Sequence, residues 1–205
     1  MSKLVVTESV SLDGVMQAPG GPNEDTDGGF AYGGWVAPHF DDEMGGLAVE
    51  GALRPDALLL GRRTYEIFAA HWPRVTGDDP IAAKLNAMPK HVASRTLEAV
   101  EWNNSTLIQG DVAEAVAELK EGPGGEIRVY GSGNLVQTLL ANDLVDELVL
   151  WVFPVLLGEG KRLFGEGTRP AGLELADAKT SSTGVALHTY RRAGAVKTGS
   201  FELED

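Results

Sequence analysis

The sequence predicts an α/β fold: a three-layer sandwich with a mixed, mostly parallel central sheet, helices on both faces and an antiparallel C-terminal hairpin. Two observations lead to this prediction. Up to residue 143, short apolar segments typical of strands alternate with longer segments of helical periodicity, as in parallel sheets covered by helices. From Asp146 onward the segments are strand-like only, which predicts an antiparallel portion at the end of the sheet.

The chain begins with a strand and a long loop. Residues 3–10, KLVVTESV, suit a strand, and residues 11–38 form a Gly-rich segment. Loops of this length without structure of their own are usually functional lids or disordered. The aromatic residues Phe30, Tyr32 and Trp35 favour a lid, because disordered linkers contain few aromatic side chains. We therefore expect residues 11–38 to gate a binding site.

A helix is expected over residues 38–53. Pro38 suits the first turn of a helix, where the missing N–H is not needed. The acidic residues Asp41, Asp42 and Glu43 suit the positive end of the helix dipole.

The middle of the chain repeats strands and helices. The expected strands are residues 57–60, 91–93, 106–109 and 126–130, and the expected helices are residues 65–71, 81–88, 112–120 and 135–143. The helix at 112–120 has the clearest pattern, since Val112, Val116 and Leu119 fall on one face and Asp111 is a suitable N-cap.

The C-terminal part predicts antiparallel strands. Residues 147–157 are strand-like, with Pro154 marking a break or an edge position. Residues 173–192 suit a hairpin about a Ser-Thr-Gly turn. The length predicts one domain over residues 1–192, and residues 193–205 are expected to form a tail or an extra strand.

The composition excludes several classes of function. A formal net charge of −13 argues against a nucleic-acid or anionic membrane surface, and no apolar run reaches membrane-spanning length. Cysteine is absent and the four histidines match no metal-ligand spacing, so no metal site is expected. The N-terminal segment does not resemble a signal peptide, so a cytoplasmic location is expected.

Three expected strands end in turns that suit an anionic ligand. The turns are residues 61–64 (GRRT), 94–96 (SRT) and 131–134 (GSGN). Ligands of open α/β sheets bind at the carboxyl ends of the strands, where helix N-termini attract anions. Three of the ten arginines lie in the first two turns, and arginine binds phosphate bidentately. The turns together predict a ligand with more than one phosphate, although GSGN alone fits a plain turn equally well.

Four stretches of the chain carry a family resemblance: SLDGVMQAP, LLLGRRTYEIF, HVASRT and VYGSGNLVQTLLANDLVDELVLWVFPVLLGEGKRLF. In these stretches the sequence resembles the dihydrofolate-reductase-like superfamily. It is most similar to stand-alone proteins related to the reductase domain of riboflavin biosynthesis. The resemblance extends over nearly the whole chain, to about residue 192, and it implies an NADPH-dependent reductase with a dihydrofolate-reductase-like fold.

The resemblance also implies which residues bind the cofactor. Residues Gly61, Arg62, Arg63 and Thr64 would contact its phosphates, Ser94 and Arg95 the adenosine 2′-phosphate, and Gly131, Ser132, Gly133, Asn134 and Leu135 the pyrophosphate. The loop at residues 11–38 would correspond to the mobile loop that closes over the nicotinamide.

The substrate side departs from the superfamily pattern. Dihydrofolate reductases bind the pterin through a carboxylate on the first helix, and here Asp41 and Asp42 lie near that place. They are the candidate catalytic residues, but acids that serve the helix dipole are at least as consistent with the sequence. Asp13 is either a turn former or a substrate-side residue. Trp35 either resembles the superfamily tryptophan or packs the lid.

We therefore expect a cytoplasmic oxidoreductase that transfers hydride from NADPH to a small, heterocyclic substrate. The alternatives are a dihydrofolate or riboflavin-precursor (ribosylamino-pyrimidinone) reductase proper and an NADP-binding module without turnover. The resemblance implies a homodimer, and no nucleic-acid or membrane partner is expected.

Overall fold

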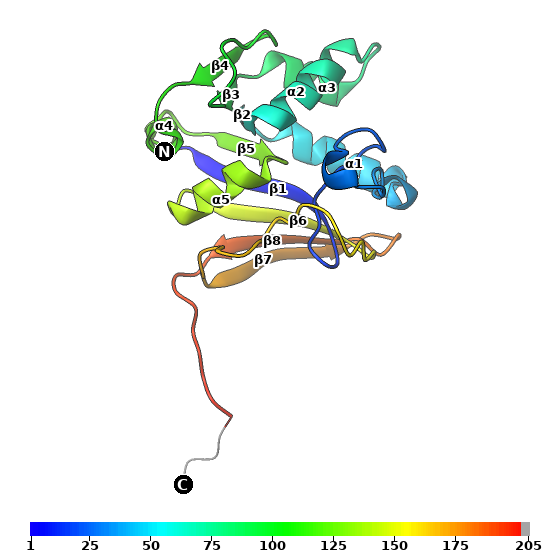
Figure 1. Cartoon of the computed structure of the whole chain (residues 1–205), viewed down its shortest axis with the longest axis vertical. Helices are drawn as coiled ribbons and strands as arrows, with labels where there is room; N and C mark the ends of the chain where they lie inside the picture. The colour runs from blue at the N-terminus through cyan, green and yellow to red at the C-terminus, as the bar shows by residue number, and fades with distance from the viewer. Residues whose placement is uncertain (202–205) are drawn as a thin grey trace.

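The computed structural model describes residues 1–201, in which eight strands form a single sheet in the order β4-β3-β2-β5-β1-β6-β8-β7 (Figure 1). The strands are β1 (Lys3–Ser11), β2 (Ala57–Gly61), β3 (Lys90–Ala93), β4 (Ser105–Ile108), β5 (Glu126–Tyr130), β6 (Glu147–Phe153), β7 (Leu173–Thr180) and β8 (Ala186–Arg192). Strands β1 to β6 pair in parallel, whereas β8 pairs antiparallel with both β6 and β7. The predicted mixed α/β fold with an antiparallel C-terminal hairpin is confirmed.

Helices cover both faces of the sheet. The α-helices are α1 (Asp42–Leu53), α2 (Arg62–His71), α3 (Pro80–Ala87), α4 (Val112–Glu121) and α5 (Gly133–Ala141), and the 3-10 helices are η1 (Asp27–Gly29), η2 (Ala37–His39) and η3 (Trp72–Arg74). Within residues 1–201, none of these helices combines the length and the apolar character needed to cross a membrane.

Strand β2 shows how the sequence places these layers. Its apolar side chains alternate between the faces of the sheet. Leu59 joins the cluster of α4 and α5, whereas Leu58 and Leu60 join the cluster of α2 and α3. All three side chains are fully buried, and burial on both faces explains why this strand is a continuous apolar run.

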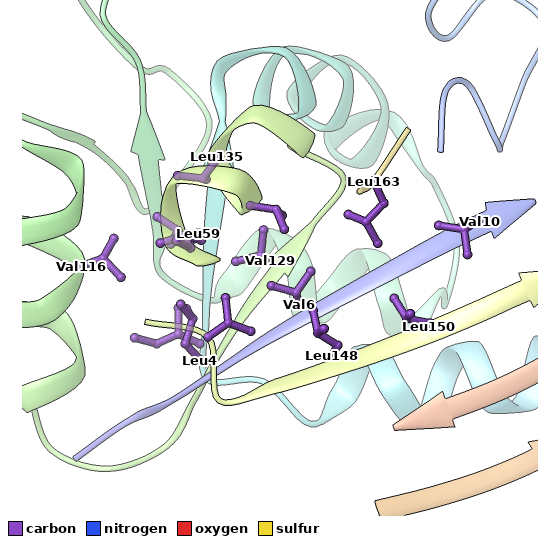
Figure 2. Close-up of a cluster of buried hydrophobic side chains, with 14 residues drawn as sticks. Leu4, Val6, Val10, Leu59, Val116, Val129, Leu135, Leu148, Leu150 and Leu163 are labelled. Atoms are coloured by element: carbon purple, nitrogen blue, oxygen red, sulfur yellow. The ribbon is translucent and has the colours of Figure 1, made fainter. Parts of the chain in front are cut away.

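Figure 2 shows the cluster beneath α4 and α5. Leu4, Val6 and Val10 of β1 point into it, together with Val129 of β5 and Leu135 of α5. The buried face of β1 therefore consists of every second residue, and the exception in this series is residue 8, a glutamate.

The loop at residues 11–38 is packed along part of its length. Phe30 and Trp35 are buried against Met44 of α1 and Phe153 of β6. The Trp35 Nε1–H donates a hydrogen bond of 2.8 Å to the Gln17 carbonyl. Tyr32, in contrast, is 52% exposed. These contacts anchor the aromatic part of the loop, and gating by the loop stays a prediction.

Three helices begin two or more residues away from their expected starts. Pro38 lies in η2, and α1 begins four residues later because Asp41 caps it, accepting a 2.9 Å hydrogen bond from the Met44 N–H. Helices α2 and α5 begin earlier than expected, so that Arg62 and Gly133 are their first residues. The predicted strand-end turns are therefore the first turns of these two helices. Residues 193–201 form neither helix nor strand, and the remainder of the expected C-terminal segment lies outside the described residues.

Candidate functional site

A large cleft of about 1580 Å³ opens at the carboxyl ends of β1, β2, β3 and β5. Its lining includes all three predicted turns: Gly61, Arg62, Arg63, Thr64, Ser94, Arg95, Gly131, Ser132, Gly133, Asn134 and Leu135. Pockets for single small molecules are usually about 300–1,000 Å³ in volume. This cleft has room for a dinucleotide and a second molecule together.

Ser132 joins the first and third turns. The Gly61 N–H donates a 2.9 Å hydrogen bond to the Ser132 Oγ, which also lies 3.0 Å from the Thr64 Oγ1. Gly131 has a φ of +56°, and a Cβ atom there would lie 2.8 Å from the same Thr64 oxygen. Glycine is therefore required at position 131 both for its conformation and for the close approach of the two turns.

The two joined turns present the N-termini of α2 and α5 to the cleft. These helices have ten and nine residues, and the first turn of a helix has backbone N–H groups without intrahelical partners. Together with the positive end of the helix dipole, they attract anions. The arrangement suits a ligand whose phosphates lie across both turns.

The three predicted arginines differ in their surroundings. Arg62 forms an ion pair with Glu66 one turn along α2, and Arg63 forms ion pairs with Asp25 and Asp27 of the loop. Arg95 is exposed and makes no hydrogen bond or ion pair with any described residue. Arg95 is therefore the arginine of this set whose guanidinium is available to a ligand without displacing a carboxylate.

An acidic segment of the loop lies over the first turn. Asp27 accepts hydrogen bonds of 2.6 and 2.9 Å from Arg63. Lys161 donates bonds of 2.6 Å to Asp25 and 2.7 Å to Asp27. The hydrogen bonds from Lys161, and to a lesser extent those from Arg63, lower the pKa of Asp27 below its ordinary value. A phosphate that binds Arg63 or Lys161 has to compete with these two carboxylates.

This competition gives a first prediction. Asp27→Ala removes one of the two carboxylates that pair with Arg63, so it should strengthen binding of the NADPH that is expected from the sequence. Because the ion pair is exposed, its contribution is small, and the gain in affinity should be at most about a few-fold. Titration calorimetry measures the change, and Asp42→Ala, which removes an exposed charge outside the cleft, is the control. Unchanged or weaker binding by Asp27→Ala alone would contradict the competition.

The remaining predicted cofactor residues contribute mainly backbone groups. Ser94 Oγ accepts hydrogen bonds from the N–H groups of Thr96 and Leu97, at 3.1 and 2.9 Å, so its hydroxyl proton remains for a ligand. The Asn134 side chain is exposed. The Leu135 side chain is only 8% exposed and belongs to the core, so only its backbone could contact a phosphate.

The other half of the cleft lies over β1, β6 and β8. Thr7, Ser9 and Trp151 line it, together with Arg128 of β5 and residues 47–52 of α1. Arg128 is buried, donates a 2.8 Å bond to Thr7 Oγ1 and forms an ion pair with Glu126. An aromatic ring beside hydroxyl and guanidinium groups suits a flat, polar heterocycle.

The predicted catalytic and substrate-side residues lie outside the cleft lining. Asp41 caps α1 and also accepts a 2.6 Å bond from Ser182 Oγ, which lowers its pKa. Asp42 is an exposed residue of the first turn, and Trp35 packs the loop. These positions match the alternatives drawn from the sequence: helix-start acids and a lid-packing tryptophan. Among the described residues, no group of three or more histidine, aspartate or glutamate side chains could hold a metal ion.

Asp13 joins the loop to the segment that follows β6. It accepts bonds from Ser11 Oγ at 2.6 Å and from the N–H groups of Leu157 and Gly158 at 3.1 and 2.8 Å. The Ser11 bond, followed by the two backbone bonds, holds the Asp13 pKa far below its ordinary value. Asp13 therefore serves as a turn former and a tie between two segments.

Asp13→Asn should destabilise the protein at neutral pH by roughly 1–3 kcal/mol, the usual value for hydrogen bonds to a charged group. Because the folded-state pKa is depressed, this stabilisation is complete above the unfolded-state pKa of about 3.9 and declines as the pH falls below it. Urea unfolding at pH 7 and pH 3 should therefore show a narrower gap between wild type and variant at pH 3. A gap that is the same at both pH values would contradict this role.

Two charged residues of the cleft were missed by the sequence analysis. Glu8 and Arg128 both line the cleft and both interrupt apolar strands in the middle of the sheet. The sequence did contain a signal for both residues, namely a charged residue within an apolar strand. Charged residues are almost never fully buried unless they have a partner or a function.

The fold and the cleft together define the class of protein. A domain model described as the RibD C-terminal domain matches residues 2–188, and the chain belongs to this family. The resemblance stated from the sequence is thus confirmed. Protein YyaP of Bacillus subtilis, itself uncharacterized, is 29% identical over 197 residues, covering 94% of this chain and 96% of its own.

Solved structures share the same fold. A protein of Shewanella sp. PV-4, provisionally assigned to riboflavin biosynthesis, has a TM-score of 0.70 at 24% identity and covers 93% of this chain and 98% of its own. Dihydrofolate reductase of Enterococcus faecalis, complexed with NADP(H), has a TM-score of 0.58 at 15% identity, with 93% and 96% covered. A Thermotoga maritima deaminase and 5-amino-6-(5-phosphoribosylamino)uracil reductase has a TM-score of 0.60 at 14% identity, with 94% and 57% covered. At these identities, the similarity establishes the fold alone.

Proposed function

We propose that this protein is a reductase that uses NADPH to reduce a pyrimidine-like heterocycle. The observation that carries the proposal is the convergence of two helix N-termini and Arg62, Arg63 and Arg95 on one cleft. In a protein of net charge −13, two helix N-termini beside Arg95, whose guanidinium has no carboxylate partner among the described residues, favour an anionic ligand. The family and the NADP(H) complex of the Enterococcus protein support a dinucleotide as that ligand.

The residues present fit a dinucleotide. The absence of a Cβ at Gly131 lets its turn pack directly against Thr64, so the first turns of α2 and α5 lie together at the cleft. The first turns of α2 and α5 would hold the pyrophosphate, and Arg95 would bind the 2′-phosphate. The bound cofactor would supply hydride. The protein's own groups bind and orient the two molecules and exclude water from the space between them.

The half of the cleft beside Trp151 is proposed to hold the substrate. Trp151 offers a stacking surface, and Thr7, Ser9 and Thr189 offer hydroxyl groups for ring nitrogen and oxygen atoms. The carboxylate that α1 contributes to the cleft is Glu50, which forms an ion pair with Arg54. The main polar groups of this half of the cleft are therefore hydroxyl groups and not a single carboxylate that could bind a pterin. This favours a pyrimidine over dihydrofolate as the substrate.

The test follows NADPH oxidation by absorbance with 5-amino-6-(5-phosphoribosylamino)uracil and with dihydrofolate as substrates. We expect turnover with the pyrimidine and little or none with dihydrofolate. Tight NADPH binding without oxidation in the presence of the pyrimidine would contradict the proposed reaction and favour an NADP-binding module. A homodimer and a cytoplasmic location stay predictions.

A further inference from the structure

Strand β1 extends beyond its neighbour at the centre of the cleft. Strand β5 ends at Tyr130, which pairs with Thr7, whereas β1 continues to Ser11 in register with β6. From Glu8 onward, β1 therefore has a strand along one edge only. Glu8 lies at the point where β5 gives way to the Gly131 turn, and it lines the cleft together with Gly131 and Met16.

The carboxyl group of Glu8 is buried without a partner. The residue is 5% exposed, and its Oε1 atom has no hydrogen-bond partner among the described residues. By alternation along β1, its side chain lies on the face of Val6 and Val10, which is the face covered by α5. Burial raises the Glu8 pKa well above its ordinary value, which favours the neutral carboxyl, and a neutral carboxyl can both donate and accept a hydrogen bond.

The fold itself gains nothing from this group. Leu4, Val6 and Val10 show that aliphatic side chains suit this face of β1. A buried polar group without a partner reduces stability, whereas an aliphatic side chain of similar size would not. The position of this group in the lining of a ligand cleft therefore points to a partner that arrives with the ligand.

We propose that the Glu8 carboxyl binds the carboxamide of the nicotinamide half of the dinucleotide, an inference that rests on the proposed function. An amide and a neutral carboxyl are complementary, because each offers a donor on one atom and an acceptor on the other. The phosphates would lie over the turns at Gly61 and Gly131, which follow β2 and β5, and Glu8 lies further along the same edge of the sheet, in the next strand, β1.

The test compares two variants and two ligands. Glu8→Leu removes the polar group at similar size, and Glu8→Gln keeps one donor and one acceptor. NADPH contains the nicotinamide half, and adenosine 2′,5′-bisphosphate lacks it. We expect Glu8→Leu to lose about tenfold in NADPH affinity, as for the loss of a hydrogen-bonded pair, and to bind adenosine 2′,5′-bisphosphate like wild type. Glu8→Gln should bind both ligands within about threefold of wild type, since its amide retains a donor and an acceptor for the same hydrogen bonds.

Thermal unfolding without ligand provides a second readout. Glu8→Leu should raise the melting temperature by at least about 2 °C, because it removes an unpartnered buried polar group. Wild-type NADPH affinity in Glu8→Leu, or an equal loss for both ligands, would overturn the inference and leave the proposed function standing. If wild type binds neither ligand, the proposed function fails, and the inference fails with it.

Discussion

Arg95→Ala should reduce the affinity for NADPH by on the order of a hundredfold and leave the affinity for NADH nearly unchanged. The two cofactors differ only in the 2′-phosphate. Charge-assisted hydrogen bonds to that group contribute roughly 1.5–3 kcal/mol each, and about 1.4 kcal/mol corresponds to a factor of ten. Arg95 has no carboxylate partner among the described residues, so its interaction with a phosphate requires no ion pair to be broken.

Dissociation constants for both cofactors, measured for wild type and Arg95→Ala at low and high salt, test this expectation. The effect should shrink at high salt because Arg95 is exposed and its charge is screened. Arg74→Ala is the matched control, since Arg74 is an exposed arginine outside the cleft and its loss changes the net charge equally. Equal losses of affinity for NADPH and NADH would show that Arg95 does not bind the 2′-phosphate.

Gly131→Ala should both destabilise the protein and abolish most cofactor binding. An alanine at a φ of +56° costs about 1–2 kcal/mol in backbone strain. The new Cβ would also lie 2.8 Å from Thr64 Oγ1, and relieving that overlap costs roughly another 1–3 kcal/mol. The relief must separate the two turns that Ser132 joins. We therefore expect NADPH affinity to fall by at least about tenfold, the equivalent of about 1.4 kcal/mol.

Gly77→Ala separates the two causes. Gly77 has a φ of +92°, no atom within 4 Å of its added Cβ, and a position outside the cleft lining. Gly77→Ala should therefore introduce backbone strain without a steric overlap. We expect a smaller loss of unfolding free energy in urea than for Gly131→Ala, and an unchanged NADPH affinity. If a folded Gly131→Ala protein binds NADPH as well as wild type, the turn is structural only.

Local patterns in the sequence were sufficient for most elements of the fold. The apolar run at residues 57–60 correctly predicted strand β2, and Asp111 was correctly expected to cap α4, where it accepts a 3.0 Å bond from the Glu114 N–H. The predicted start of α1 was wrong because Pro38 and Asp41 both suit the start of a helix. Pro38 lies in the 3-10 helix η2, and Asp41 is the residue that caps α1.

The parts of the site that the sequence predicted correctly are those at the carboxyl ends of strands. The turns at Gly61, Ser94 and Gly131 do meet at one cleft, because parallel strands end at the same edge of a sheet. The ion pairs between Asp27 and Arg63, 36 residues apart, and between Asp27 and Lys161, 134 residues apart, depend on the path of two loops. No periodicity in the sequence encodes that path. Glu8 was overlooked because its charge within an apolar strand does not by itself show that the residue lines the cleft.

The most direct test of the central claim is a crystal structure of the protein in complex with NADPH. The account predicts the pyrophosphate over the first turns of α2 and α5, the 2′-phosphate at Arg95 and the nicotinamide in the cleft beside Glu8. Cofactor density at another surface, or in the cleft with its phosphates away from these turns, would contradict it.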